Sequence, residues 1–250
     1  MPEIFPVSIP DRLPVRIEPC PILEAVFETR FVSRESWATM PGLLYAQIRE
    51  KYTEQQNLPL AQVPEEARRQ DPVLQLLPLM QFLSHDFLIQ LGPRVLSLAT
   101  KPNAYPGWPA IQKELGWVIE RVRSAGFVSE SERLGARYVD FFEEDIFPGL
   151  RLRLTVNDQP LHGLQTSVST AFRRGPLVIR LRVTNGAVVA MAQGPKRGSV
   201  LDMHAFFGPL EMDLFENGLA RFAEAHTTIK GLFFGLIKPE LLAKLHPVYA

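Results

Sequence analysis

The sequence predicts an α+β fold built mostly on antiparallel sheet, with a few long helices. Many short runs alternate between apolar and polar residues, which is the period-two pattern of half-buried strands. Short turn signals separate many of these runs, and strands joined by short turns pair antiparallel. Two longer segments, 109–125 and 213–232, instead repeat apolar residues at helical spacing.

Three parts are expected along the chain. Residues 1–21 carry Pro2, Pro6, Pro10 and Pro14 at every fourth position and form an extended arm, because each proline fixes φ and removes a backbone donor. Residues 22–146 form an α+β half, and residues 147–250 form a β-rich half with a long C-terminal helix. Each half has several strands and one long helix, so two similar halves and one single domain both remain open at this length.

The first half begins with a strand over 22–32, in which Leu23, Ala25, Phe27 and Phe31 share one face. Helical spacing follows within 34–52, and the polar, proline-containing segment 53–72 is expected to be a long loop with one helical turn at 65–69. A three-strand meander is expected over 73–82, 87–91 and 94–100. A helix starts at Pro109 and ends at a Gly126 C-cap, and a strand covers 133–142.

The second half is expected to begin with strands over 150–156 and 166–172. Asn185-Gly186 between two apolar runs predicts a hairpin joining strands 177–183 and 187–191. The basic segment Gly194–Gly198 is expected to be a loop, either a surface turn or a cradle for an anion. A strand over 200–207, a helix over 213–232 and a short helix over 240–245 complete the series.

Charge is balanced overall and uneven locally. The chain has 27 Lys+Arg and 27 Asp+Glu, whereas the segment 149–200 contains Asp158 as its single acid. Acids gather just before it at Glu143, Glu144 and Asp145, so pairing within the chain is one alternative to a partner. The cationic residues of the segment are Arg151, Arg153, Arg173, Arg174, Arg180, Arg182, Lys196 and Arg197.

We expect these cations to bind an acidic protein partner through one face of a sheet. Arg151 and Arg153 alternate with apolar neighbours, as do Arg180 and Arg182, so each pair presents two arginines on one side of a strand. Nucleic acid is the alternative partner, since the same side chains suit phosphates. The residues interleaved with them are Leu, Thr and Val, without the aromatic side chains on which bases stack.

An enzyme is the second alternative. Glu24, Glu28 and Arg30 share the polar face of the first strand, and Arg137 and Asp140 extend that face if their strand lies beside it. A structural ion-pair network explains the same residues more simply. Nucleophile-elbow and phosphate-loop motifs are missing, so no catalytic residue is assigned and no cofactor is expected.

No metal site is expected, because the five histidines His85, His162, His204, His226 and His246 are scattered without ligand spacing. His204 alone shares a strand face with a nearby acid, Asp202. The single Cys20 and the N-terminal composition favour a cytoplasmic protein, and no run is apolar enough to predict a membrane span.

The chain resembles a sporadically distributed family of bacterial proteins of similar length to which no biochemical activity is assigned. The resemblance rests on PILEAVFETRF (21–31), FLSHD (82–86), QLGPRVLSL (90–98), YPGW (105–108), RLGARYVD (133–140) and LDMHAFF (201–207). It implies an accessory role in a defence or mobile-element locus and carries over no functional residue. This chain departs from the family pattern at Ala136, where a larger aliphatic is expected, at Asp140 for an amide, and at His204 for an acid.

Overall fold

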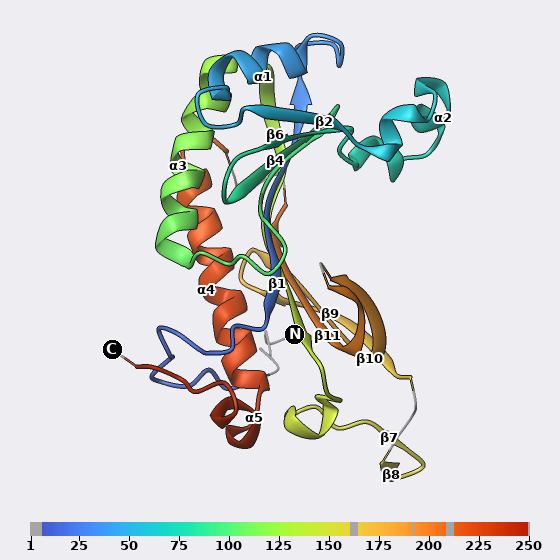
Figure 1. The fold of residues 1–250 in the computed structure, drawn as a ribbon, viewed down its shortest axis with the longest axis vertical. Helices are drawn as coiled ribbons and strands as arrows, with labels where there is room; N and C mark the ends of the chain where they lie inside the picture. Colours follow the sequence, from blue (N-terminus) through green and yellow to red (C-terminus); the bar gives the residue numbers. More distant parts are fainter. Residues whose placement is uncertain (1–6, 161–164, 192, 209–212, 250) are drawn as a thin grey trace. The chain divides into compact units, whose positions relative to one another are not determined.

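The computed structural model describes residues 7–160, 165–191, 193–208 and 213–249, and it confirms the α+β class. Nine antiparallel strands are ordered β2-β3-β4-β5-β1-β6-β11-β10-β9, and β7 pairs with β8 in a separate hairpin (Figure 1). No helix in this part of the chain combines the length and the apolar character that crossing a bilayer requires.

The chain divides into two compact units, each built from separate segments. Unit 1 contains Met1–Leu23, Arg137–Ala205 and His226–Ala250, and unit 2 contains Glu24–Ala136 and Phe206–Ala225. Strands β6 and β11 and helix α4 contribute residues to both units, so a boundary at a single point along the chain does not separate compact parts. The arm and two halves expected from the sequence stay a prediction about chain organisation.

Unit 2 holds the meander and two of the longer helices. Its elements are β1 (Ile22–Ser33, from Glu24 on), α1 (Met40–Ile48), β2 (Glu54–Asn57), the 3-10 turn Pro59–Gln62, α2 (Glu65–Gln70), the 3-10 turn Leu74–Leu76, β3 (Met80–Leu83), β4 (Phe87–Gly92), β5 (Val95–Thr100), α3 (Trp108–Ala125), the first part of β6 (Val128–Phe142), the end of β11 (Gly194–Phe207, from Phe206 on) and the first part of α4 (Gly218–Leu236, up to Ala225).

The core of unit 2 follows from the period of β1. Ala25, Phe27, Thr29 and Phe31 are buried, as the alternating pattern predicts. The Phe27 ring lies 5.7 Å from that of Phe222 and 5.8 Å from that of Trp108, at the YPGW corner that opens α3. The predicted α3 C-cap is confirmed: Gly126 adopts φ 75, and its N–H donates to Val122 O at 3.3 Å.

Two expectations in unit 2 are wrong. Residues 54–57 form strand β2, with every residue exposed, where a loop was expected. Strand β3 begins at Met80 and not at Val73, because residues 74–76 form a 3-10 turn. The first error concerns a segment that pairs with β3 and lacks an alternating pattern of its own.

Unit 1 holds the rest of the sheet. Its elements are the end of β6, the 3-10 turn Phe147–Gly149, β7 (Thr155–Val156), β8 (Gln159–Pro160), β9 (Ser167–Arg174), β10 (Leu177–Met191), β11 (Gly194–Phe207, up to Ala205), the second half of α4 (Gly218–Leu236) and α5 (Pro239–Ala243). The segment Gly194–Gly198 therefore belongs to strand β11 and is not a loop.

The expected strand 150–156 forms only at its end, as β7, because its first residues bond to the end of α4. Arg151 N–H donates to Leu236 O at 2.7 Å, and Leu150 bridges Ile237. Asn157 and Asp158 form the turn between β7 and β8, and their φ values of 49 and 60 suit a two-residue β-hairpin turn.

The predicted Asn185-Gly186 hairpin is also wrong, because β10 continues through both residues. Asn185 bonds through both its backbone and its side chain to Thr166, the residue before β9: its N–H donates to Thr166 O at 3.0 Å, and its Oδ1 accepts from Thr166 N at 2.6 Å. Gly186 adopts φ 64 inside the strand, a conformation that glycine takes without a Cβ clash.

The proline-rich arm lies along unit 1 beside the C-terminal segment (Figure 1). Val15 N–H donates to Val248 O at 2.8 Å, and Val248 N–H donates to Arg16 O at 2.8 Å. Two glycines of α4 leave room for the arm, since a Cβ on Gly235 would lie 2.8 Å from Val7 Cγ2. The described part of the arm thus packs on the body of the protein; Pro2 and Pro6 lie outside the described residues.

We predict that Gly198→Ala lowers the free energy of unfolding by about 2–3 kcal/mol. A Cβ at this position would lie 2.1 Å from the backbone oxygen of Phe142 and 2.8 Å from the Phe141 ring, so β6 and β11 must separate. Gly42→Ala in α1 is the control: nothing lies within 4 Å of its Cβ, and stability should rise by about 0.5–1 kcal/mol. Equal denaturation midpoints for Gly198→Ala and the wild type would contradict the close strand approach.

Candidate functional site

The candidate site is one face of the β9–β10 hairpin in unit 1. The two strands pair antiparallel from Leu177↔Arg174 to Thr184↔Ser167 without interruption. On β10, four alternate residues are buried: Leu177, Ile179, Leu181 and Val183. The residues between them therefore point to the opposite, open face.

Three arginines meet on this open face. Arg180 lies opposite Ala171, Arg182 opposite Ser169, and Arg173 opposite Val178. Directly paired residues of two antiparallel strands have their side chains on the same face, which places the three guanidinium groups together. We call this surface the cationic face; its members are Ser167, Ser169, Ala171, Arg173, Val178, Arg180, Arg182 and Thr184.

None of the eight members of the cationic face is acidic. Arg173 and Arg182 are exposed, and neither makes an ion pair with any residue that the structure describes. Asp202 on β11 is engaged by Arg137, which holds its two carboxylate oxygens with hydrogen bonds of 2.8 Å each. The neutral members of the face are small or carry hydroxyls, such as Ser167 and Thr184, whose oxygens lie 2.9 Å apart.

Five expected members of the cationic patch lie elsewhere. Arg151 is outside the sheet, and its guanidinium donates to Gly235 O at 2.9 Å and Ile237 O at 3.0 Å at the C-terminal end of α4. Arg153 is exposed and outside any strand. Arg174 pairs with Leu177, so its side chain projects to the other side of the hairpin. The interpretation of Arg151 and Arg153 as a strand face is therefore corrected.

The two cations at the start of β11 also differ from the expected loop. Lys196 forms an ion pair with Glu143, and Lys244 holds Glu144 with contacts of 2.8 and 2.7 Å. Arg197 is exposed. Part of the cationic segment thus pairs with the acids that precede it in the chain, which is the intramolecular alternative that the charge distribution allowed.

The expected polar face does not form as one surface on β6. Arg137 is exposed and pairs with Asp202, whereas Asp140 is only 2% exposed. Positions three apart on a strand point to opposite faces, so these two residues cannot share a site. In unit 2, Glu28 accepts from Arg30 Nε at 2.9 Å, and Glu24 lies on the same half-buried face of β1.

Asp140 is a buried carboxyl for which the described part of the chain supplies no ion-pair partner. Its Oδ2 has no hydrogen-bond partner among the residues that the structure describes. Burial, with a smaller contribution from the Asp202 charge, raises the pKa of Asp140 to about 8. The side chain is therefore held protonated at neutral pH, and the pKa of the neighbouring Cys20 thiol is also raised by burial.

The histidines do not build a site. Burial lowers the pKa of His226 to about 4, so it is neutral, and its Nδ1 lies 2.7 Å from the Tyr138 hydroxyl beneath α4. His85 is exposed beside Asp86, and His162 lies outside the described residues. Within 7–160, 165–191, 193–208 and 213–249, no three His, Cys, Asp or Glu side chains are placed to hold a metal ion.

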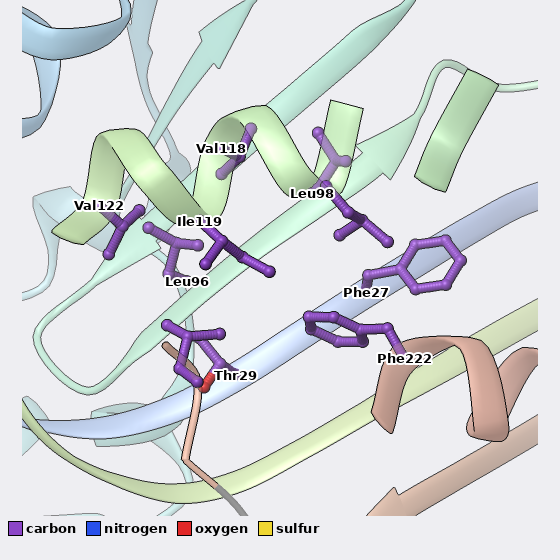
Figure 2. A pocket seen from close by; sticks show the side chains of 10 residues that line it. Phe27, Thr29, Leu96, Leu98, Val118, Ile119, Val122 and Phe222 are labelled. Carbon is purple, nitrogen blue, oxygen red and sulfur yellow. The ribbon is translucent and has the colours of Figure 1, made fainter. Parts of the chain in front are cut away.

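The two cavities described in unit 2 carry no reactive chemistry. Figure 2 shows apolar side chains of β1, β5 and α3 converging with Phe222 on a space of about 10 Å³, which has room for one water molecule at most. A groove of about 430 Å³ lies between α3 and the segment 214–223. Its charged lining residues are Glu120 and Glu216, and none of the lining residues is basic.

The sequence prediction named all three face arginines among its eight cations, but it also included five that lie elsewhere and missed the neutral residues of the face. The alternation of Arg180 and Arg182 with apolar residues was the signal. Which of Arg173 and Arg174 lies on the cationic face depends on the register of β9 with β10, and that register is known only from the strand pairing. No protein-family model matches the chain, and no curated protein matches it.

We predict that Asp140→Asn removes a pH-dependent loss of stability. The folded-state pKa lies near 8 and the unfolded value near 3.8, so the folded state holds the proton more tightly and unfolding becomes easier as pH rises between the two. At pH 9 the variant should be more stable than the wild type by up to about 6 kcal/mol, with little difference near pH 3. Denaturant titrations between pH 3 and pH 9 measure this difference in the free energy of unfolding.

The control Asp158→Asn, at an exposed turn, should leave the pH profile of stability unchanged. Matching pH profiles for the two variants would refute the assignment to Asp140.

We predict that Arg151→Ala lowers the free energy of unfolding by about 1–2 kcal/mol, because two carbonyls at the end of α4 lose a charged donor. The matched control Arg153→Ala removes an exposed arginine two residues away and should change stability by less than about 0.5 kcal/mol. Thermal and denaturant unfolding measure both. Equal effects of the two substitutions would show that Arg151 has no structural role.

Proposed function

We propose that this chain is a non-enzymatic accessory protein that binds an acidic surface of another protein through the cationic face. The observation that carries the proposal is the placement of Arg173, Arg180 and Arg182 on one open face of β9 and β10. Complementary charge of this kind guides and selects partners, and arginine is enriched at protein interfaces.

A protein partner fits this surface better than nucleic acid. Proteins that bind single strands stack bases on aromatic side chains, and the members of the cationic face between the arginines are Ser, Ala, Val and Thr. Hydroxyls such as those of Ser167 and Ser169 suit the mixed polar contacts of a protein interface. The resemblance of the sequence to a sporadic bacterial family supports an accessory role in a defence or mobile-element system.

The triple charge reversal Arg173→Glu, Arg180→Glu and Arg182→Glu tests the proposal. The tagged protein is captured from its native cells with nuclease present, and bound proteins are identified by mass spectrometry. We expect a stoichiometric protein that the wild type retains and the triple variant loses at least about tenfold, because like charges now face each other. Thermal stability should be unchanged, since all three side chains are exposed.

The matched control reverses three exposed arginines away from this face: Arg34→Glu, Arg49→Glu and Arg153→Glu. It makes the same change in net charge and should retain the partner. Loss of the partner in both variants would reduce the effect to overall charge and contradict a specific face. Capture that disappears with nuclease and falls steeply with salt would assign the arginines to nucleic acid instead.

A further inference from the structure

The hairpin that carries the cationic face also ends the sheet. Strand β9 is the last strand in the order of the described sheet, so one of its sides has no strand partner there. It is eight residues long, and only Val168 and Phe172 are partly buried. An edge strand of this length presents a row of backbone donors and acceptors to solvent.

Within the described residues, the edge has neither a proline nor a bulge, two of the features that block strand addition. Proteins shield such edges with proline, a bulge or a very short strand. The sequence of β9 is SVSTAFRR, which has no proline, and its pairing with β10 runs without a bulge over all eight residues. Its charges lie at one end, at Arg173 and Arg174.

The backbone groups that face outward belong to residues of the cationic face. The hydrogen bond from Asn185 N–H to Thr166 O marks one hydrogen-bonded pair, and such pairs alternate along an antiparallel ladder. Residues 168, 170, 172 and 174 therefore direct their backbone groups toward β10, and the residues between them direct theirs outward. The outward set is Ser167, Ser169, Ala171 and Arg173.

We propose that the edge of β9 binds an extended acidic segment of the partner protein as an added β-strand. This inference rests on the proposed function and names the form of the partner. A strand paired with β9 places every second side chain on the cationic face, so acids at alternate positions meet Arg173 directly and Arg180 one strand further on. A second copy of this chain is a poorer occupant, because it would join two arginine-bearing faces into one.

The probe is a capped nine-residue peptide, Thr-Glu-Val-Glu-Val-Glu-Val-Glu-Thr. Its binding to the full-length protein is followed by titration calorimetry and by residue-resolved amide hydrogen exchange. In the free protein, the amides of 168, 170 and 172 should exchange slowly and those of 167, 169 and 171 fast. At saturation with the peptide, exchange of the amides of 167, 169 and 171 should slow by at least about tenfold, because they now donate hydrogen bonds to the peptide.

Two methylated peptides separate strand addition from charge attraction alone. We expect the peptide to pair antiparallel to β9, as β10 does. The glutamates on the cationic face then point their own N–H groups at β9, and methylating these nitrogens should weaken binding at least about tenfold. Methylating the valine nitrogens, which point away, should weaken it less than about threefold. A lysine-for-glutamate peptide should not bind.

Each other outcome overturns the inference. Equal binding of both methylated peptides without new amide protection would leave the cationic face intact and exclude strand addition. Absence of binding at millimolar glutamate peptide would exclude this class of ligand. A dimer of the free protein whose odd-numbered β9 amides are already protected would assign the edge to a second copy. The triple reversal variant should lose peptide binding. The capture experiment tests the proposed function without any peptide, so failure of the proposed function is distinguishable from failure of strand addition.

Discussion

Alternating burial along β10 is the constraint on which the cationic face depends. Leu177, Ile179, Leu181 and Val183 are each no more than 6% exposed. Burying a side chain of this kind contributes about 1.5–3 kcal/mol, so four of them outweigh any preference of the exposed residues for another register. A slip by one residue would bury Arg180 and Arg182 instead, and uncompensated buried charges cost several kcal/mol each. The hydrophobic pattern therefore holds the arginines outside.

The cations of this protein fall into two groups that the net charge of zero conceals. Some cations stabilise the fold: Arg151 binds the carbonyls at the end of α4, and Lys196 and Lys244 pair with the acids of 143–144. Arg173 and Arg182 have no such role within the described residues, although they lie in the same stretch of sequence. The distinction arises from position in the fold, because the structural cations lie beside acceptors that the chain brings from far away.

Elements with strong local signals could be predicted from the sequence. The alternation of β1, the proline in the first turn of α3 and its Gly126 C-cap depend on neighbouring residues alone. The hairpin at Asn185 could not be excluded locally, because the hydrogen bonds of Asn185 go to Thr166, which lies 19 residues earlier. Residues 150–151 take their backbone partners from the end of α4, more than 80 positions later. The burial of Asp140 was invisible for the same reason, since its face of β6 is set by packing beneath α4.

Site-specific photo-crosslinking in the native cells tests most directly whether the cationic face contacts a protein. A photoreactive amino acid is placed at Ser169, on the cationic face, or at Thr170, its exposed neighbour whose side chain points to the opposite side of β9. We predict that position 169 crosslinks to one protein partner and position 170 does not, because adjacent strand residues differ in face and in little else. Equal crosslinking from both positions, or a product that contains nucleic acid, would contradict the account.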